Sequence, residues 1–191
     1  MDTAAMAPSH DRTPVLTVGT VVWLASELMF FSGLFAAYFT LRATARGDWP
    51  PADVHLEVVT SGLFTLGLVL SSGTMQLAVR AIAAGRRAAF RGWLVVTLVL
   101  AAAFIGNQVH EWSSLDFSVS SHAFGSAFYV MTGFHGMHVM GGMLAMVLLL
   151  GRAGNRRFGP EDVPAVEVVS YYWHFVDVVW IGMWATLFLL R

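Results

Sequence analysis

Long apolar stretches follow one another along the chain, and short polar stretches separate them. A helix needs roughly 20 mainly apolar residues to cross a bilayer. Five stretches are long enough, at 15–41, 58–79, 92–109, 123–151 and 165–190. They are too continuously apolar for the period-two strands of a membrane β-barrel. The pattern predicts an all-α, polytopic membrane bundle of five transmembrane helices, forming one domain over 15–191 after a short tail at 1–14.

Composition narrows the possible chemistry. Of the 191 residues, 57% are hydrophobic and only 12% are charged, which is about half the charged share of a soluble protein. The absence of Cys excludes disulfides, iron–sulfur clusters, thiolate nucleophiles and cysteine-ligated metals. A formal net charge of −1 gives no indication of nucleic-acid binding.

All eleven basic residues are Arg, and their positions predict the orientation in the membrane. Eight lie in the tail and in the connections 80–91 and 152–164, against three on the opposite side. Cytoplasmic segments of membrane proteins carry the excess of basic residues. We therefore expect a cytoplasmic N-terminus and a C-terminus outside.

Five ionisable residues fall deep inside the predicted spans, namely Glu27, His135, His138, His174 and Asp177, whereas Glu167 lies near the start of the fifth span and is expected to reach the interface. Each charge at the bilayer centre costs about 2.5–3.5 kcal/mol or more, so each needs a reason. Counting from the span centres places all five within about a turn of the midplane. The two His of the fourth span are spaced i,i+3, as are His174 and Asp177, so each pair shares a helix face. Asp177 is expected to accept a hydrogen bond from His174 and fix its tautomer.

Three interpretations of these residues remain open on the residues alone. Imidazoles on facing helices can ligate a metal or haem, although three deep His suffice for one small site only. Ionisable groups at bilayer depth are also typical of proton paths. The third interpretation is structural, in which polar groups and small residues hold helices together. Small residues of this kind occur in the fourth span, at Gly133, Gly136, Gly141 and Gly142.

Five sequence blocks resemble the cytochrome c oxidase subunit III family, in the family's order. They are ASELMFF at 25–31, WPP at 49–51, QVHEW at 108–112, TGFHGMHV at 132–139 and YWHFVDVVW at 172–180. Most members have seven helices, and this chain lacks the first two, as in the short actinobacterial form. Where many members carry His and Glu before the glycine of the 80–91 connection, this chain has Arg80 and Ala84.

The resemblance implies an accessory subunit of a haem-copper oxidase, which reduces O₂ to water with electrons from cytochrome c and pumps protons. Haems and copper would belong to partner subunits I and II, and this chain would bind no cofactor or metal and carry no catalytic residue. It would pack on subunit I in the bacterial cell membrane, hold structural phospholipid and support proton uptake. Small additional subunits and a cytochrome bc complex in a supercomplex are further partners that the resemblance allows.

The resemblance also suggests roles for individual residues. The predicted buried polar or proton-related set is Glu27, His135, His138, His174, Asp177 and Glu111. The predicted lipid-binding set is Glu27, Trp23, Arg80, Arg86, Arg87 and His135. Two alternatives remain, a subunit III homologue of a quinol oxidase or nitric oxide reductase, and a free-standing membrane protein that carries haem or protons.

Overall fold

The computed structural model describes residues 15–52, 54–155 and 158–190, so the predicted tail at 1–14 lies outside the described residues. Five long helices make up most of this part of the chain. They are α1 (Val15–Thr44), α2 (Val58–Ala83), α3 (Arg87–Ser114), α4 (Ala123–Arg152) and α5 (Val163–Trp184), with short helical turns η1 (Pro160–Asp162) and η2 (Ala185–Leu189) flanking α5. Each of the five is long and apolar enough to cross a membrane. The predicted all-α bundle of five spanning helices is confirmed.

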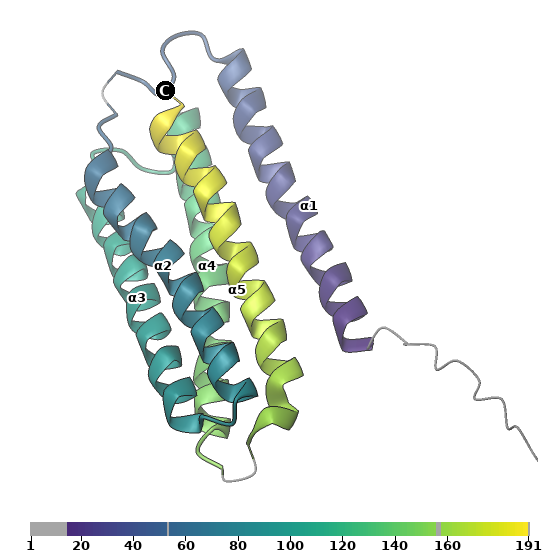
Figure 1. Ribbon diagram of the computed structural model, residues 1–191. Coiled ribbons are helices and arrows are strands. Elements are labelled where there is room, and N and C mark those ends of the chain that lie inside the picture. The colour runs from purple at the N-terminus through teal and green to yellow at the C-terminus, as the bar shows by residue number, and fades with distance from the viewer. Residues whose placement is uncertain (1–14, 53, 156–157, 191) are drawn as a thin grey trace, which may run out of the picture.

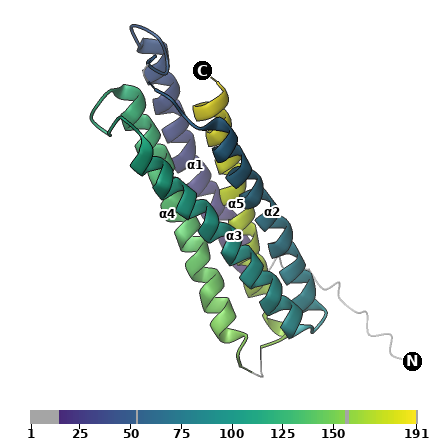
Figure 2. The ribbon, with the colours of Figure 1, turned by 90° about the vertical axis from the view of Figure 1, so that its left-hand side faces the viewer.

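The helices run up and down beside one another, and α1 occupies one flank (Figure 1). α5 lies between α2 and α1 and packs against both, while α4 also contacts α1, α3 and α5. Figure 2 views the same bundle from the side of α2 and α3, with α1 behind them. α5 is the most buried of the spans, and α1 is the least buried. A large part of the α1 surface is therefore left for the membrane or for partner subunits.

The connection between α2 and α3 is much shorter than the polar stretch 80–91 that the sequence pattern suggested. α2 continues through Arg80 to Ala83, and α3 already begins at Arg87. Gly85 adopts a left-handed φ of +70°. Its N–H donates to Ile82 O at 2.9 Å and the next N–H, of Arg86, donates to Ala81 O at 2.9 Å. These two hydrogen bonds to the last turn form the common glycine-terminated helix end. Only three residues, 84–86, separate α2 from α3.

Close packing of α4 on α5 depends on a glycine. A Cβ atom added at Gly142 would lie only 2.8 Å from the ring of Trp173, whereas one added at Gly136 would meet nothing within 4 Å. Trp173 and Trp180, both on α5, are almost completely buried and form the centre of the core. At Gly142 a neighbouring side chain therefore approaches α4 closely, whereas Gly136 borders open space.

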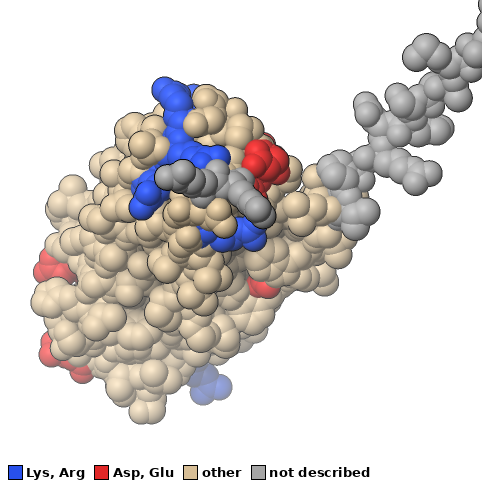
Figure 3. All heavy atoms as spheres, turned by 90° about the horizontal axis from the view of Figure 1, so that it is seen from below, with Lys and Arg blue, Asp and Glu red and all other residues tan. Residues whose placement is uncertain are grey.

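Five of the seven described Arg side chains gather at the end of the bundle where α2 and α4 end and α3 begins (Figure 3). They belong to Arg80, Arg86, Arg87, Arg91 and Arg152. Antiparallel neighbouring helices bring these separate stretches of sequence to one face. The face carries the basic excess that the sequence predicts for the cytoplasmic side.

Candidate functional site

The clearest polar contact inside the membrane-spanning region joins α1 to α4. His138 Nε2 lies 2.9 Å from Glu27 Oε2, and both side chains are only partly exposed, at 18% and 23%. His138 Nδ1 lies 2.7 Å from the carbonyl oxygen of Phe134. Because a carbonyl oxygen only accepts, Nδ1 must carry a proton there. A single further proton is then shared between Nε2 and the Glu27 carboxyl, as either a neutral pair or an ion pair.

Aromatic groups fix this pair and add α5 to it. Trp23 Nε1 donates to Glu27 Oε1 at 3.1 Å, one helical turn away on α1. The Trp23 ring stacks on Tyr172 of α5 with ring centroids 4.9 Å apart. The Tyr172 hydroxyl in turn donates to the His138 carbonyl oxygen at 3.0 Å. Three helices are thus connected around one carboxyl group.

A second polar cluster lies between α2 and α5, and it corrects one expectation. His174 does not donate to Asp177 directly. The Ser72 hydroxyl donates to Asp177 Oδ2 and lies 2.9 Å from His174 Nδ1, so Ser72 bridges the two residues. With the serine proton committed to the carboxylate, Nδ1 must donate to Ser72, while Nε2 lies 3.2 Å from the Ser170 hydroxyl and 3.5 Å from Gln76 Oε1. Asp177 therefore sets the His174 tautomer through a serine, which the i,i+3 spacing alone could not reveal.

His135 lies apart from both clusters. It is 0% exposed, and its ring stacks on Trp180 at 4.7 Å and meets the edge of Phe104 at 5.9 Å. Neither ring nitrogen has a hydrogen-bond partner among the described residues. The spacing of three residues turns His135 toward α3 and α5 while His138 points toward α1. Since His135 has no exposed surface, a lipid beside this bundle would contact the other residues of the predicted lipid-binding set.

Glu111 occupies a third position, near the end of α3. Its side chain is 8% exposed, and Oε1 has no partner among the described residues. It borders a polar cavity of about 340 Å³ that Glu57 and His110 also line. The predicted polar residues therefore do not form one site. Within the part of the chain that the structure describes, no three His, Asp or Glu side chains are placed to hold a metal ion.

Comparison with known proteins shows the family of this chain. The family model described as cytochrome c oxidase subunit III matches residues 6–190. The chain belongs to the cytochrome c oxidase subunit III family. A probable cytochrome c oxidase subunit 3 of Nocardia farcinica is 47% identical over 186 residues, which cover 96% of this chain and 92% of the relative.

Two further relatives are matched over most of their length. A probable cytochrome c oxidase subunit 3 of Mycobacterium tuberculosis is 45% identical, again over 96% of this chain and 92% of the relative. The cytochrome c oxidase subunit 3 of Corynebacterium diphtheriae is 42% identical, over 95% of this chain and 91% of the relative. The resemblance to the short actinobacterial form is confirmed. As a subunit III, the chain is a membrane protein of a multi-subunit oxidoreductase complex.

Proposed function

We propose that this chain is the cofactor-free accessory subunit of a bacterial cytochrome c oxidase, bound to subunits I and II in the plasma membrane. In this role it stabilises subunit I, holds structural phospholipid and supports proton uptake. The observation that carries the proposal is the Glu27–His138 pair, a carboxyl and an imidazole 2.9 Å apart near the middle of two spanning helices. An ionisable pair at that depth indicates a functional role.

The lipid part of the proposal rests on an apolar groove beside this pair. The groove has a volume of about 320 Å³ and is lined by Trp23, Gly141, Ala145, Val168, Val169 and Tyr172. Trp23 also donates to Glu27, so the wall of the groove is connected to the carboxyl group. An acyl chain fits such a surface. Arg80, Arg86 and Arg87 at the basic end of the bundle offer partners for lipid phosphates.

The proton part rests on the chemistry of the Glu27–His138 pair. One proton can sit on either partner without breaking the hydrogen bond, because the imidazole is already protonated at Nδ1. Partial exposure of both side chains leaves them accessible to a neighbouring subunit or to water at its surface. A pair of this kind can hold a proton on either partner without rearrangement of the helices, and can thereby assist proton entry into subunit I.

Affinity purification of the tagged chain from its native membrane in mild detergent tests the proposal. We expect subunits I and II to accompany it, together with haem absorbance in the visible spectrum. A copper-binding subunit II with paired cysteines would identify cytochrome c as the electron donor. The same tag on an unrelated five-span protein is the control and should recover no haem. Recovery of the chain alone with its own haem or metal would overturn the proposal.

A further inference from the structure

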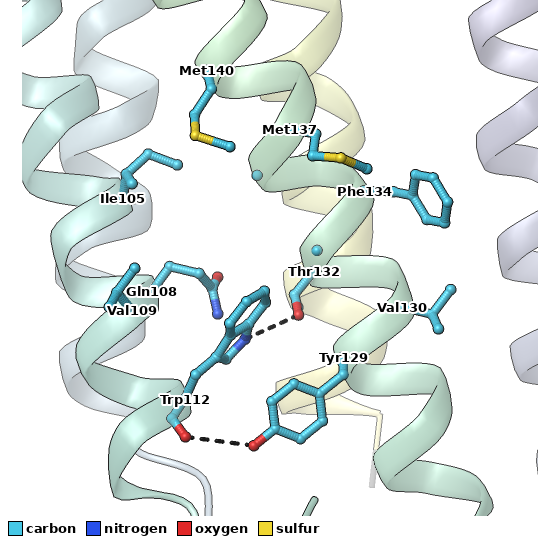
Figure 4. Close-up of a pocket in the computed structure, with 12 residues that line it drawn as sticks. Ile105, Gln108, Val109, Trp112, Tyr129, Val130, Thr132, Phe134, Met137 and Met140 are labelled. Carbon is cyan, nitrogen blue, oxygen red and sulfur yellow. Dashed lines mark hydrogen bonds between the residues drawn. The ribbon is translucent and has the colours of Figure 1, made fainter. Parts of the chain in front are cut away.

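A second cavity lies between α3 and α4, separate from the groove beside Glu27. Its volume is about 400 Å³, and most of its lining is apolar (Figure 4). Ile105 and Val109 of α3 form one wall, and Met137 and Met140 of α4 form the other. Apolar pockets with a few convergent polar groups are the usual form of a site for a small molecule. A ligand in this cavity would need a polar group of the lining to orient it.

Gln108 supplies such a group. Its side chain is 6% exposed, and its amide Nε2 has no hydrogen-bond partner among the described residues. Figure 4 shows this side chain extending from α3 toward the indole of Trp112 and toward Thr132. Both neighbours are already engaged, since Trp112 Nε1 donates to Thr132 Oγ1 at 3.3 Å and the Thr132 hydroxyl donates to Phe128 O at 2.7 Å. A buried N–H without an acceptor is costly, and an acceptor on a bound molecule would satisfy it.

The position of Gln108 along the membrane direction constrains the ligand. Gln108 lies six residues before the end of α3 at Ser114, which is about 9 Å from the helix end. Met140 lies near the middle of α4, at the opposite end of the cavity (Figure 4). The polar end of the cavity is thus nearer the membrane surface, and its apolar end is nearer the bilayer centre. An amphiphile inserted in that leaflet has the same polarity.

We propose that the α3–α4 cavity binds one membrane amphiphile whose carbonyl oxygen accepts a hydrogen bond from Gln108 Nε2. Its apolar chain lies along Met137 and Met140. The ester carbonyl of a glycerolipid and the ring carbonyl of an isoprenoid quinone share this chemistry. α4 faces α1 at the Glu27–His138 pair and faces α3 at this cavity, so the site does not depend on the function proposed for that pair.

Two substitutions test the site from opposite ends. Gly136 lines the cavity, and a Cβ atom there meets nothing within 4 Å. Gly136→Leu therefore fills the space of the ligand, while Gln108→Leu removes the donor and keeps an apolar side chain of similar size. Gly106→Leu is the matched control, because Gly106 also has open space around its Cβ position but does not line the cavity.

The measurement is native mass spectrometry of the purified oxidase complex, with the retained amphiphiles counted per complex. We expect Gly136→Leu to lose one bound molecule. Gln108→Leu should weaken the affinity for the bound molecule about fivefold, the equivalent of about 1 kcal/mol for one neutral hydrogen bond, and so retain fewer molecules per complex than the wild type. Gly106→Leu should retain the wild-type number. The mass of the lost molecule distinguishes the two sources, since a diacyl glycerolipid and an isoprenoid quinone differ in mass.

Photocrosslinking provides a readout that does not require either variant to assemble. A photoreactive amino acid at position 137, in an otherwise wild-type complex, should become linked to a molecule of lipid or quinone mass. A crosslink to a transmembrane helix of another subunit would show that protein covers the cavity, and this would overturn the proposal. Unchanged retention in an assembled Gln108→Leu complex would overturn it as well.

Discussion

Glu27 and His138 stand 111 residues apart in the sequence, yet their side chains meet at 2.9 Å near the middle of two helices. This contact, with the stacked Trp23 and Tyr172, connects α1 to α4 and α5. The contact has two properties. Its hydrogen bond crosses a helix interface and so stabilises packing in the membrane, and its shared proton can take part in proton transfer. The variants below separate these properties.

Replacement of Glu27 by Gln should leave the oxidase complex assembled with full haem content and lower its turnover modestly. The Gln amide can still donate to His138 Nε2, so the helix contact remains while the exchangeable proton is lost. Haem content from the visible spectrum and oxygen consumption of the purified complex measure the two effects. Glu27→Leu, which removes the contact as well, is the comparison and should weaken retention of the subunit. Complete loss of haem in Glu27→Gln would contradict the assignment.

Removal of the Ser72 hydroxyl should destabilise the subunit by about 1–3 kcal/mol, because Ser72→Ala leaves His174 and Asp177 without their common partner. Unfolding of the purified subunit in mixed detergent micelles, followed by circular dichroism, measures this loss. Ser32→Ala is a matched control, since among the described residues its hydroxyl is hydrogen-bonded only to the carbonyl oxygen of Leu28 in its own helix. Equal stability of the two variants would show that the bridge contributes nothing.

Introduction of a methyl group at Gly142 should be destabilising by about 1–3 kcal/mol, because it overpacks the α4–α5 contact against the Trp173 ring. The same change at Gly67, where a Cβ atom meets nothing within 4 Å, should be neutral or slightly stabilising. Thermal inactivation of the complex and retention of the subunit compare the two variants. A Gly142→Ala subunit as stable as wild type would mean that α4 and α5 are not closely packed.

His135→Phe should be tolerated, with a change in stability below about 1.5 kcal/mol. The imidazole lies between Trp180 and Phe104 and makes no hydrogen bond to the described residues, so an aromatic hydrocarbon of similar shape preserves its contacts. His138→Phe, which breaks the bond to Glu27, is the contrasting variant and should release α1 from the bundle more easily. Failure of the His135→Phe complex to assemble would reveal a polar partner for this ring.

The orientation in the membrane can be tested directly, because the native chain has no Cys to create a background. Single cysteines in place of Arg86, in the α2–α3 turn, and Ser120, in the α3–α4 connection, lie at opposite ends of the bundle. A membrane-impermeant maleimide added to intact cells should label position 120 and not position 86. The reverse labelling would show that the Arg-rich face is outside.

The spanning helices and the family could be predicted from the sequence because both depend on local signals. Twenty consecutive apolar residues must become a helix in lipid, where every backbone polar group needs an internal partner. Family motifs such as TGFHGMHV at 132–139 can likewise be recognised from the sequence alone. The hydropathy pattern nevertheless underestimated the length of the helices. α3 extends beyond the predicted range 92–109 into polar residues at both ends, because polar residues form helical hydrogen bonds as readily as apolar ones.

Only the tertiary structure decided which polar side chains meet. The spacing of His135 and His138 predicts a shared helix face, but the rotation of α4 against its neighbours sends one toward Trp180 and the other toward Glu27. The same holds for Ser72, which no motif singles out and which is placed between His174 and Asp177 by the packing of α2 on α5. The rotation and register of each helix against its neighbours depend on contacts between residues far apart in sequence. The hydrophobic periodicity of a single helix therefore does not predict them.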